Sequence, residues 1–395
     1  MTPHPKTNLK IRPKSNLRPG HPWLYRSQLE EPREPIEPGS LIELHGSGGR
    51  FLGRGYYNPK SEITVRLLTQ KDEVINTDFF KKKLKQAIDY RKSFVKDTNA
   101  FRLVSSEADG LPGLIIDRYN EILVVQFLTL GMERLRGPVL EALEVLVPSR
   151  GIYERSDSSS RSIEGLEPKI GWIRKDCGDE TIIVEKNIQY KIHFGEGQKT
   201  GFYLDQRENR IFLGELHVQG EALDAFCYSG GFGLHLAANG SKVFGIDSQS
   251  EAITQGKENR TLNNIDPALL EFEQANVFDA LKRFEKEKRK YNLVILDPPS
   301  FVKRKEALEG ALSGYKEILL RSMKILHEEG LLAVFSCSHH IDDNLLMQAS
   351  MSAAWDVRRT LKVIKFFKQS SDHPINPFIP ETYYLKGFLF SVSSV

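Results

Sequence analysis

The sequence predicts an α/β protein whose C-terminal part is a Rossmann-like, mostly parallel sheet with an antiparallel edge hairpin. From about residue 200, apolar strands alternate with helical stretches, a pattern typical of βαβ units with helices on both faces. The expected strands are Ala222–Phe226, Lys242–Ile246, Leu293–Leu296 and Leu331–Phe335. The expected helices between and after them include Gln249–Asn263 and Glu306–Leu326. At the end of the chain, two apolar stretches joined by a proline-rich turn without a helix predict the hairpin, Lys362–Phe367 and Tyr383–Val392.

Two smaller regions precede this sheet. Residues 1–72 are rich in Gly and Pro and predict a small β domain with strands at Ser40–Leu44, Gly53–Tyr57 and Glu62–Leu68. Residues 73–190 predict an α+β module that begins with a helix near 77–96, with Thr77 or Asp78 as its N-cap. Strands at Leu114–Asp117 and Ile122–Leu128 and a helix near 132–146 follow. The third domain is expected to cover residues 191–395.

Composition excludes several classes of protein. With 395 residues, 40% of them hydrophobic and 27% charged, the chain is typical of globular proteins and long enough for two to three domains. Its apolar runs fall far short of the roughly 20 residues that span a bilayer, and no signal peptide is evident. The three cysteines are odd in number, widely spaced and without a CxxC pair, so neither a disulfide framework nor a structural zinc site is expected. A cytoplasmic location fits this cysteine usage.

The near-neutral net charge conceals an uneven distribution. The chain has 55 Lys and Arg against 52 Asp and Glu, a formal charge of +3, yet residues 1–30 and residues 81–100 each carry a local charge of +5. Smaller basic clusters lie at Lys282–Lys290 and Lys303–Lys305. Such clusters can neutralise RNA phosphates, although each one alone also fits a solvated helix face. We expect the first two clusters to lie on the side of the reaction centre and to contact RNA together.

A glycine-rich loop follows the first strand of the predicted sheet. Cys227-Tyr228-Ser229-Gly230-Gly231-Phe232-Gly233 allows close backbone approach to a ligand, but Leu236 occupies the place of the third glycine of a dinucleotide fingerprint. A nucleoside-type site is therefore favoured over a nicotinamide site. Asp247 ends the next strand, where a carboxylate can accept both ribose hydroxyls. Asp279 is interpreted as a further acid at a strand end, within reach of an adenine amino group.

The predicted reaction centre lies at the ends of two later strands. Asp297 follows a buried strand and precedes Pro298 and Pro299, which fix an extended backbone. Cys337 follows the next strand, so both side chains are expected to face one crevice. A thiolate that adds to C6 of cytosine makes C5 nucleophilic toward an electrophilic methyl group, and a carboxylate can hold the ring. The alternative is an inert core cysteine, a reading that applies more strongly to Cys177 and Cys227.

These segments resemble the class I S-adenosylmethionine (SAM)-dependent methyltransferases. More narrowly, the chain is similar over nearly its whole length to the three-part bacterial large-subunit rRNA (cytosine-C5)-methyltransferases of the RlmI type, which carry an N-terminal PUA domain. The segments that carry the resemblance are 20–25, 53–59, 107–114, 198–210, the loop 224–233, Asp297-Pro298-Pro299-Ser300-Phe301 and Ser336-Cys337-Ser338.

The resemblance implies a role for particular residues. It implies that Cys337 is the nucleophile and Asp297 the acid that holds the base. The positions implied to bind SAM are Asp205, Arg207, Phe226, Tyr228, Gly230, Gly231, Asp247, Asp279, Asp297 and Pro298. Of these, Asp205 and Arg207 would close over the cofactor or order its loop.

Several alternatives stay open at this point. Relatives with the same architecture methylate guanine N7 without a thiol, so another base or atom is one alternative. A non-catalytic RNA-binding assembly factor is a second, and a nicotinamide oxidoreductase is a distant third. We expect large-subunit rRNA as partner, no membrane and no metal; a homodimer and the identity of the target nucleotide are left open.

Overall fold

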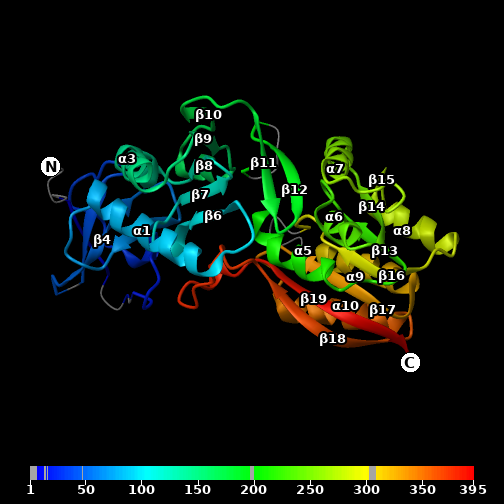
Figure 1. Cartoon of the computed structure of the whole chain (residues 1–395). Coiled ribbons are helices and arrows are strands. Elements are labelled where there is room, and N and C mark those ends of the chain that lie inside the picture. Colours follow the sequence, from blue (N-terminus) through cyan, green and yellow to red (C-terminus); the bar gives the residue numbers. More distant parts are fainter. Residues whose placement is uncertain (1–6, 13–14, 16, 47, 196–199, 302–307) are drawn as a thin grey trace. The chain divides into compact units, whose positions relative to one another are not determined.

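The chain forms two compact units. The computed structural model describes residues 7–12, 15, 17–46, 48–195, 200–301 and 308–395. Unit 1 comprises Met1–Ile183, Ile192–Leu204 and Ser371–Thr382, and unit 2 comprises Val184–Lys191, Asp205–Ser370 and Tyr383–Val395 (Figure 1). The expected β domain and residues 73–183 of the expected central module therefore belong to unit 1, whereas residues 184–190 of that module belong to unit 2. The proline-rich turn, expected within the C-terminal domain, belongs to unit 1 as well.

The first sheet of unit 1 has five strands in the order β1-β3-β4-β5-β2. Its strands are β1 (Asn8–Lys10), β2 (Trp23–Tyr25), β3 (Leu41–His45), β4 (Phe51–Tyr57) and β5 (Ile63–Thr69). Alternate side chains such as Ile42 and Leu44 of β3 and Val65 and Leu67 of β5 form its core. The three expected strands are present, and the short β1 and β2 at the edges add to them.

The second sheet of unit 1 has the order β10-β9-β8-β7-β6. Its strands are β6 (Ala100–Ser105), β7 (Leu114–Tyr119), β8 (Ile122–Phe127), β9 (Gly151–Ser156) and β10 (Lys169–Arg174). The helices of this region are α1 (Thr77–Phe94), α2 (Leu130–Arg134), α3 (Arg136–Leu146) and α4 (Ser160–Glu164). Phe80 and Leu84 of α1 pack into the same core as Tyr56 of β4, so the first sheet also contributes to the core of the second sheet, besides having a core of its own.

Two details of the helices differ from the sequence predictions. The N-cap of α1 is Asn76, because its backbone is extended and its side chain accepts a hydrogen bond from the N–H of Phe79. The helix expected near 132–146 is two helices that meet at Leu135. Pro138 lies in the first turn of α3, where its missing N–H has no partner to lose, whereas it would interrupt one continuous helix.

Unit 2 contains the expected sheet, with seven strands in the order β15-β14-β13-β16-β17-β19-β18. Its strands are β13 (Glu221–Ala225), β14 (Lys242–Asp247), β15 (Leu270–Gln274), β16 (Tyr291–Leu296), β17 (Leu326–Ser336), β18 (Arg359–Lys368) and β19 (Lys386–Ser394). The first five are parallel, and β19 is antiparallel to both β17 and β18. The predicted parallel sheet with an edge hairpin is confirmed.

Helices cover both faces of this sheet (Figure 1). They are α5 (Arg207–Gly214), α6 (Gly231–Ala238), α7 (Ser250–Leu262), α8 (Val277–Lys286), α9 (Leu308–Lys324) and α10 (Asp343–Asp356). Leu223 and Ala225 of β13 pack with α8, α9 and α10. Because side chains of a strand alternate, Asp224 between them faces the opposite side, where it contacts α6. Every central strand is therefore buried on both faces, which explains its continuous apolar run.

The remaining strands, β11 (Glu180–Glu185) and β12 (Ile188–His193), form a two-stranded sheet. Among the described residues, no helix is both long and apolar enough to cross a membrane. Some basic residues of the charge clusters, namely Lys6, Lys14 and Lys303–Lys305, lie outside the described residues, as do Gln198, Lys199 and Glu306.

Candidate active site

The predicted site residues lie at the carboxyl ends of neighbouring strands. In the sheet, β14, β13, β16 and β17 are adjacent and parallel. Asp247 ends β14, Asp297 follows β16, and Cys337 follows β17. Open α/β sheets bind their ligands at this edge. The sheet order thus brings together side chains that are up to 90 positions apart in the sequence.

The loop after β13 has an unusual backbone. Phe226 and Tyr228 have positive φ values of 64° and 49°, and Gly230 has φ 83°. Non-glycine residues rarely adopt this region, and such strain concentrates at functional sites. A Cβ at Gly230 would lie 2.7 Å from the ring of Phe272, so this position needs glycine for both conformation and space. The predicted close approach of backbone to a ligand is compatible with this loop.

Asp224, which the sequence analysis did not single out, lies directly beneath the loop. It is fully buried; its Oδ2 accepts a hydrogen bond from the N–H of Gly233 (2.9 Å), and its Oδ1 has no hydrogen-bond partner. Burial and, to a smaller extent, the nearby carboxylates of Asp297 and Asp247 together raise the pKa of Asp224 to about 7. Three carboxylates at adjacent strand ends form an environment that favours a positively charged ligand.

Asp247 holds the same loop from the next strand. Its Oδ2 accepts from the N–H of Tyr228 (2.9 Å) and its Oδ1 from the N–H of Gln249 (3.0 Å). Each carboxylate oxygen has a second lone pair, so ribose hydroxyls can still donate to it. Asp279 lies elsewhere than expected: it is in the first turn of α8 rather than at a strand end, its side chain is 79% exposed, and it lies 4.0 Å from the Lys282 amine. β15 ends before it, at Gln274.

The segment before α5 contacts the site. Gln206 donates from Nε2 to Oδ2 of Asp297 (3.0 Å). Asp205 is buried, and its Oδ2 accepts from the hydroxyl of Tyr384 (2.8 Å). Arg207 is also buried, with its guanidinium 3.6 Å from Glu208. In this structure, the neighbour Gln206 makes the direct contact with Asp297.

A buried ion pair supports the glycine loop from below. Arg210 of α5 pairs with Glu185, and the donor–acceptor distance from its Nε to Oε2 is 2.9 Å. Burial by itself would raise the pKa of Glu185, but the charge of Arg210 and the neighbouring His235, whose Nε2 lies 3.6 Å from Oε2, keep this pKa below its usual value. A Cβ at Gly231 would lie 2.9 Å from Cδ of Arg210, so the arginine stem packs directly against the start of α6.

Cys337 is half-buried and has a buried lysine beside it. Lys386 of β19 is opposite Ser336 of β17, and its Nζ donates to the carbonyls of Ser338 (2.8 Å) and Tyr384 (3.0 Å). Burial lowers the pKa of Lys386, while interaction with Asp343 and Cys337 opposes that change. The Lys386 amine is therefore close enough to Cys337 for their charges to interact. Cys227 differs, since burial raises the pKa of its thiol well above the ordinary value.

Tyr315 of α9 lies within electrostatic range of both parts of the reaction centre. Burial raises its pKa, and Cys337 and Asp297 each raise it further. His339 and His340, which closely follow Cys337 in the sequence, are exposed.

Comparison with known proteins assigns the fold and the family. The model of an S-adenosylmethionine-dependent methyltransferase family matches residues 166–390, and the model of a PUA-like domain matches residues 8–70. The ribosomal RNA large subunit methyltransferase I of Tolumonas auensis is 39% identical over 386 residues, which cover 96% of this chain and 97% of the relative. The chain belongs to this methyltransferase family.

A further relative supports the family, and two solved structures share the fold. The large subunit methyltransferase I of Shewanella frigidimarina is 36% identical, with 97% of this chain and 99% of the relative covered. The crystal structure of SMU.776, described as a methyltransferase and complexed with SAH, has a TM-score of 0.84 at 22% identity and covers 98% of this chain and 100% of that one. A protein described as SAM-dependent, from Streptococcus mutans, has a TM-score of 0.81 at 21% identity over 98% and 100% of the two chains.

The residues of this methyltransferase fit its cofactor, SAM. SAM carries a positive sulfonium and an ammonium group, and Asp224 supplies a buried carboxylate oxygen without a partner beneath the loop. Both the negative charge of the carboxylates at the strand ends and the close backbone of the glycine loop therefore suit SAM.

Four residues near these strand ends were not predicted from the sequence: Asp224, Gln206, Asn276 and Lys386. Asp224 and Gln206 lie inside segments that carry the resemblance, but their polar contacts were not evident from spacing. Asn276 caps α8, where its side chain accepts from the N–H groups of Phe278 and Asp279. It directly follows the loop after β15, so an N-cap pattern could have shown that the strand ends before it.

Proposed function

We propose that this protein forms 5-methylcytidine in large-subunit rRNA through a covalent adduct of Cys337. The relatives that it matches are named as large-subunit rRNA methyltransferases. The observation that carries the choice of atom is the half-buried Cys337 at the end of β17, beside Asp297 at the end of the adjacent β16. Methylation of a ring nitrogen needs no thiol at this position.

Particular residues would hold the cofactor. The backbone of Gly230 and Gly231 would approach its amino acid end, and Asp247 would accept the ribose hydroxyls. Phe226, Tyr228 and Pro298 would line the site, and Asp205 and Arg207 would order it. Bound SAM supplies a methyl group on a positively charged sulfur. Asp279, expected near the adenine, is exposed in the first turn of α8, and Asn276, which caps this helix, is exposed as well.

Asp297 would position the cytosine. Its carboxyl group would accept a hydrogen bond from the exocyclic amine on one oxygen and, acting as the acid, donate a proton to N3 from the other, and so neutralise the negative charge that develops there when a thiolate adds to C6. Gln206 fixes Oδ2 of Asp297 by a 3.0 Å hydrogen bond. Pro298 and Pro299 restrict the backbone that follows it. The carboxylate is therefore oriented before the base arrives.

Cys337 would add to C6 as a thiolate. A free cysteine is only a few per cent thiolate at neutral pH, so the site needs a neighbouring positive charge. Lys386 can supply it from the opposite strand, since its charge interacts with that of Cys337. After methyl transfer to C5, loss of the C5 proton and elimination of the thiolate would restore the aromatic ring.

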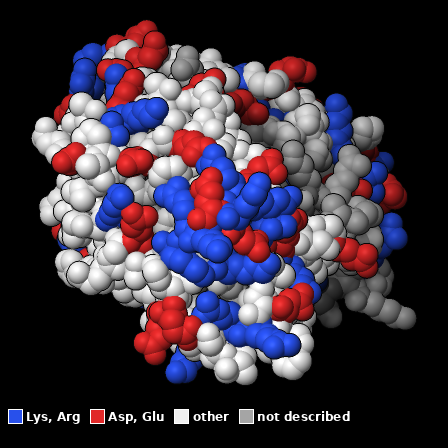
Figure 2. Space-filling model, turned by 90° about the vertical axis from the view of Figure 1, so that its right-hand side faces the viewer, with Lys and Arg blue, Asp and Glu red and all other residues white. Residues whose placement is uncertain are grey.

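The basic clusters differ in how well they fit an RNA contact. In residues 81–100, Arg91 is buried and paired with Asp109, so it serves the fold of unit 1. On the same helix, Lys85 pairs with Asp89 and fits a solvated face, whereas among the described residues Lys83 makes no ion pair with a carboxylate. The cluster Lys282–Lys290 lies at α8, and Lys and Arg are mixed with Asp and Glu on this face (Figure 2). Arg283 pairs with Glu273 and Arg289 covers aromatic rings, so this cluster fits a solvated face of ion pairs.

Two measurements test the proposal. Cys337→Ala should abolish methyl transfer to rRNA while SAM binding, measured by calorimetry, stays within about two-fold. RNA that contains 5-fluorocytidine should form a covalent complex with the wild-type protein that resists denaturing electrophoresis, and Cys337→Ala should form none. Near-normal turnover by Cys337→Ala would rule out the adduct.

Mass analysis of nucleosides identifies the product. Large-subunit rRNA from cells without this protein should lack one 5-methylcytidine that the purified protein restores in vitro. Restoration of a methylated guanosine instead would show that the family assignment holds but that the choice of atom is wrong. No methyl transfer to naked or assembled rRNA would favour the assembly factor.

A further inference from the structure

A cavity lined by several charged side chains lies in unit 1, in a different part of the chain from the active-site residues. It has a volume of about 330 Å³, within the range that holds small ligands. Three walls come from the end of β5 and the residues after it, from α1, and from the short helix η2 (Ser106–Asp109) with Gly110. Residues before β2, together with Asn376 and Ile379, complete it. The established family assignment gives this cavity no role.

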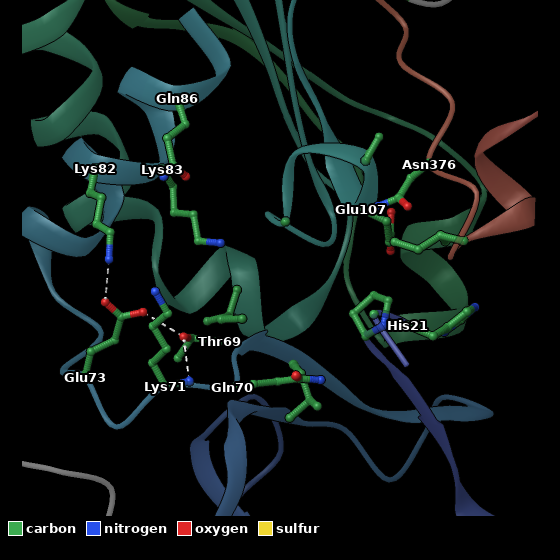
Figure 3. A pocket seen from close by; sticks show the side chains of 17 residues that line it. His21, Thr69, Gln70, Lys71, Glu73, Lys82, Lys83, Gln86, Glu107 and Asn376 are labelled. Carbon is green, nitrogen blue, oxygen red and sulfur yellow. Dashed lines mark hydrogen bonds and ion pairs between the residues drawn. The ribbon is translucent and has the colours of Figure 1, made fainter. Parts of the chain in front are cut away.

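One side of the cavity is basic. Figure 3 shows Lys71 and Lys83 on the same side, with the Lys83 amine directed into the cavity. Lys82 is different because it pairs with Glu73 (2.9 Å), whose other oxygen accepts from the hydroxyl of Thr69 (2.6 Å). Both oxygens of Glu73 are thus used, and among the described residues neither Lys71 nor Lys83 makes an ion pair with a carboxylate.

Lys83 is held where its charge is poorly solvated. Burial is the main reason why its pKa is lowered. Its Nζ lies 5.8 Å from the centre of the Phe79 ring, and a Cβ at Gly110 would be 3.0 Å from it. An amine that is partly removed from water and has no paired carboxylate gains free energy when an anion binds beside it.

The opposite side carries groups that match the edge of a base. Glu107, Asn376 and His21 lie there (Figure 3). Oε1 of Glu107 accepts from the indole N–H of Trp23 (3.0 Å), which fixes the carboxylate and leaves Oε2 as an acceptor. A carboxylate accepts well from an exocyclic amine of a base and repels a phosphate. A ligand with an anionic end and an amine-bearing end therefore has one preferred orientation.

From this arrangement we infer that the cavity binds one unpaired nucleotide of the substrate RNA, other than the nucleotide that is methylated. Lys71 and Lys83 hold its phosphate, and Glu107 accepts from its base. RNA is recognised mainly through such unstacked nucleotides, because their base edges are accessible. The inference rests on the proposed function for the identity of the RNA. A free nucleotide has the same chemistry, and the experiment separates the two sources.

Lysine acylation read by mass spectrometry tests occupancy directly. The full-length protein is labelled alone, with its own large-subunit rRNA transcribed in vitro, and with 5′-CMP or 5′-AMP. The transcript should reduce labelling of Lys71 and Lys83 several-fold. Lys85 is the matched control, since it is on the same helix, pairs with Asp89 and does not line the cavity. Protection by the free nucleotides but not by the transcript would overturn the inference, as would no protection at all.

Variants then measure the contribution to RNA binding. Lys83→Met and Lys71→Met should each weaken binding of the transcript about three- to ten-fold at moderate salt. Each should also make the fall of log K (the association constant) with log salt concentration less steep, by about 0.7 in slope. This is the value for one lost phosphate contact to a single strand. Glu107→Gln should weaken binding without changing this slope, and Lys85→Met should change neither. Equal slopes for Lys83→Met and Lys85→Met would refute the phosphate contact.

These binding measurements do not depend on the reaction. If the protein transfers no methyl group to cytosine but the transcript protects Lys71 and Lys83, the proposed function fails and the inference stands. If methylation proceeds and Lys83→Met leaves KM for the transcript unchanged, the inference fails and the proposed function stands.

Discussion

Asp224 should make unit 2 less stable as the pH rises through neutrality. Its pKa is about 7 in the folded chain, against an ordinary value of 3.8, because the carboxyl group is fully buried. Because the pKa is higher in the folded chain, the stabilisation by the protonated carboxyl group is complete below pH 3.8. It is lost progressively as the pH rises from 3.8 to about 7. At about 1.36 kcal/mol per pH unit, the loss reaches roughly 4 kcal/mol above neutral pH. Between pH 5 and pH 8 it amounts to about 2.5 kcal/mol.

Asp224→Asn removes the titration and keeps an oxygen that can accept from the N–H of Gly233. The difference in Tm between the variant and the wild type should therefore increase from pH 5 to pH 8 and become constant above that. At about 2–4 °C per kcal/mol for a domain of this size, the increase should be roughly 5–10 °C. Scanning calorimetry of both proteins without cofactor measures it, and groups that titrate equally in both proteins cancel in the difference.

Cofactor binding provides an independent check. A cation beside Asp224 favours its ionised form, so SAM should bind the wild type more tightly as the pH rises from 6 to 8, whereas the affinity of Asp224→Asn should change less. A Tm difference that does not change with pH, or that decreases from pH 5 to pH 8, would refute the assignment of a neutral buried carboxyl group.

Three further predictions concern the same unit. Lys386→Met should move the half-maximal pH of kcat/KM for methyl transfer upward by about one unit or more while SAM affinity stays unchanged, and an unmoved pH profile would exclude the lysine from activating the thiol. Arg210→Met leaves the carboxylate of Glu185 buried without its partner and should lower the unfolding free energy of unit 2 by about 3–5 kcal/mol, measured by denaturation; a loss below about 1 kcal/mol would contradict a structural role for the pair. Gly230→Ala should weaken SAM binding at least ten-fold in calorimetry, because the added methyl group collides with the Phe272 ring at a positive φ; wild-type affinity would show that the loop adapts.

Much of the site was predictable because it depends on local pattern. A buried apolar strand followed by Gly, Asp or Asp-Pro-Pro indicates the edge of a parallel sheet, and this pattern placed Gly230, Asp247 and Asp297. The position of Asp279 was predicted wrongly, because the strand was extended past Gln274 across the N-cap Asn276 into α8. The N-cap of α1 is a similar case. The periodicity of apolar residues predicted the helix, but only the backbone dihedrals show that Asn76 is the polar residue that precedes its first turn.

The amino-acid sequence by itself determined the succession of strands and helices, the glycine loop and the family, since each follows from local periodicity, turn residues or short motifs. Only the tertiary structure decided which distant side chains act on one another. β19 lies between β17 and β18, and its register sets Lys386 opposite Ser336, next to Cys337. That register depends on how apolar side chains of both strands pack into a shared core, which no local pattern encodes. The same reason applies to Asp224: its raised pKa comes from burial and from carboxylates on other strands, and both exist only in the folded chain.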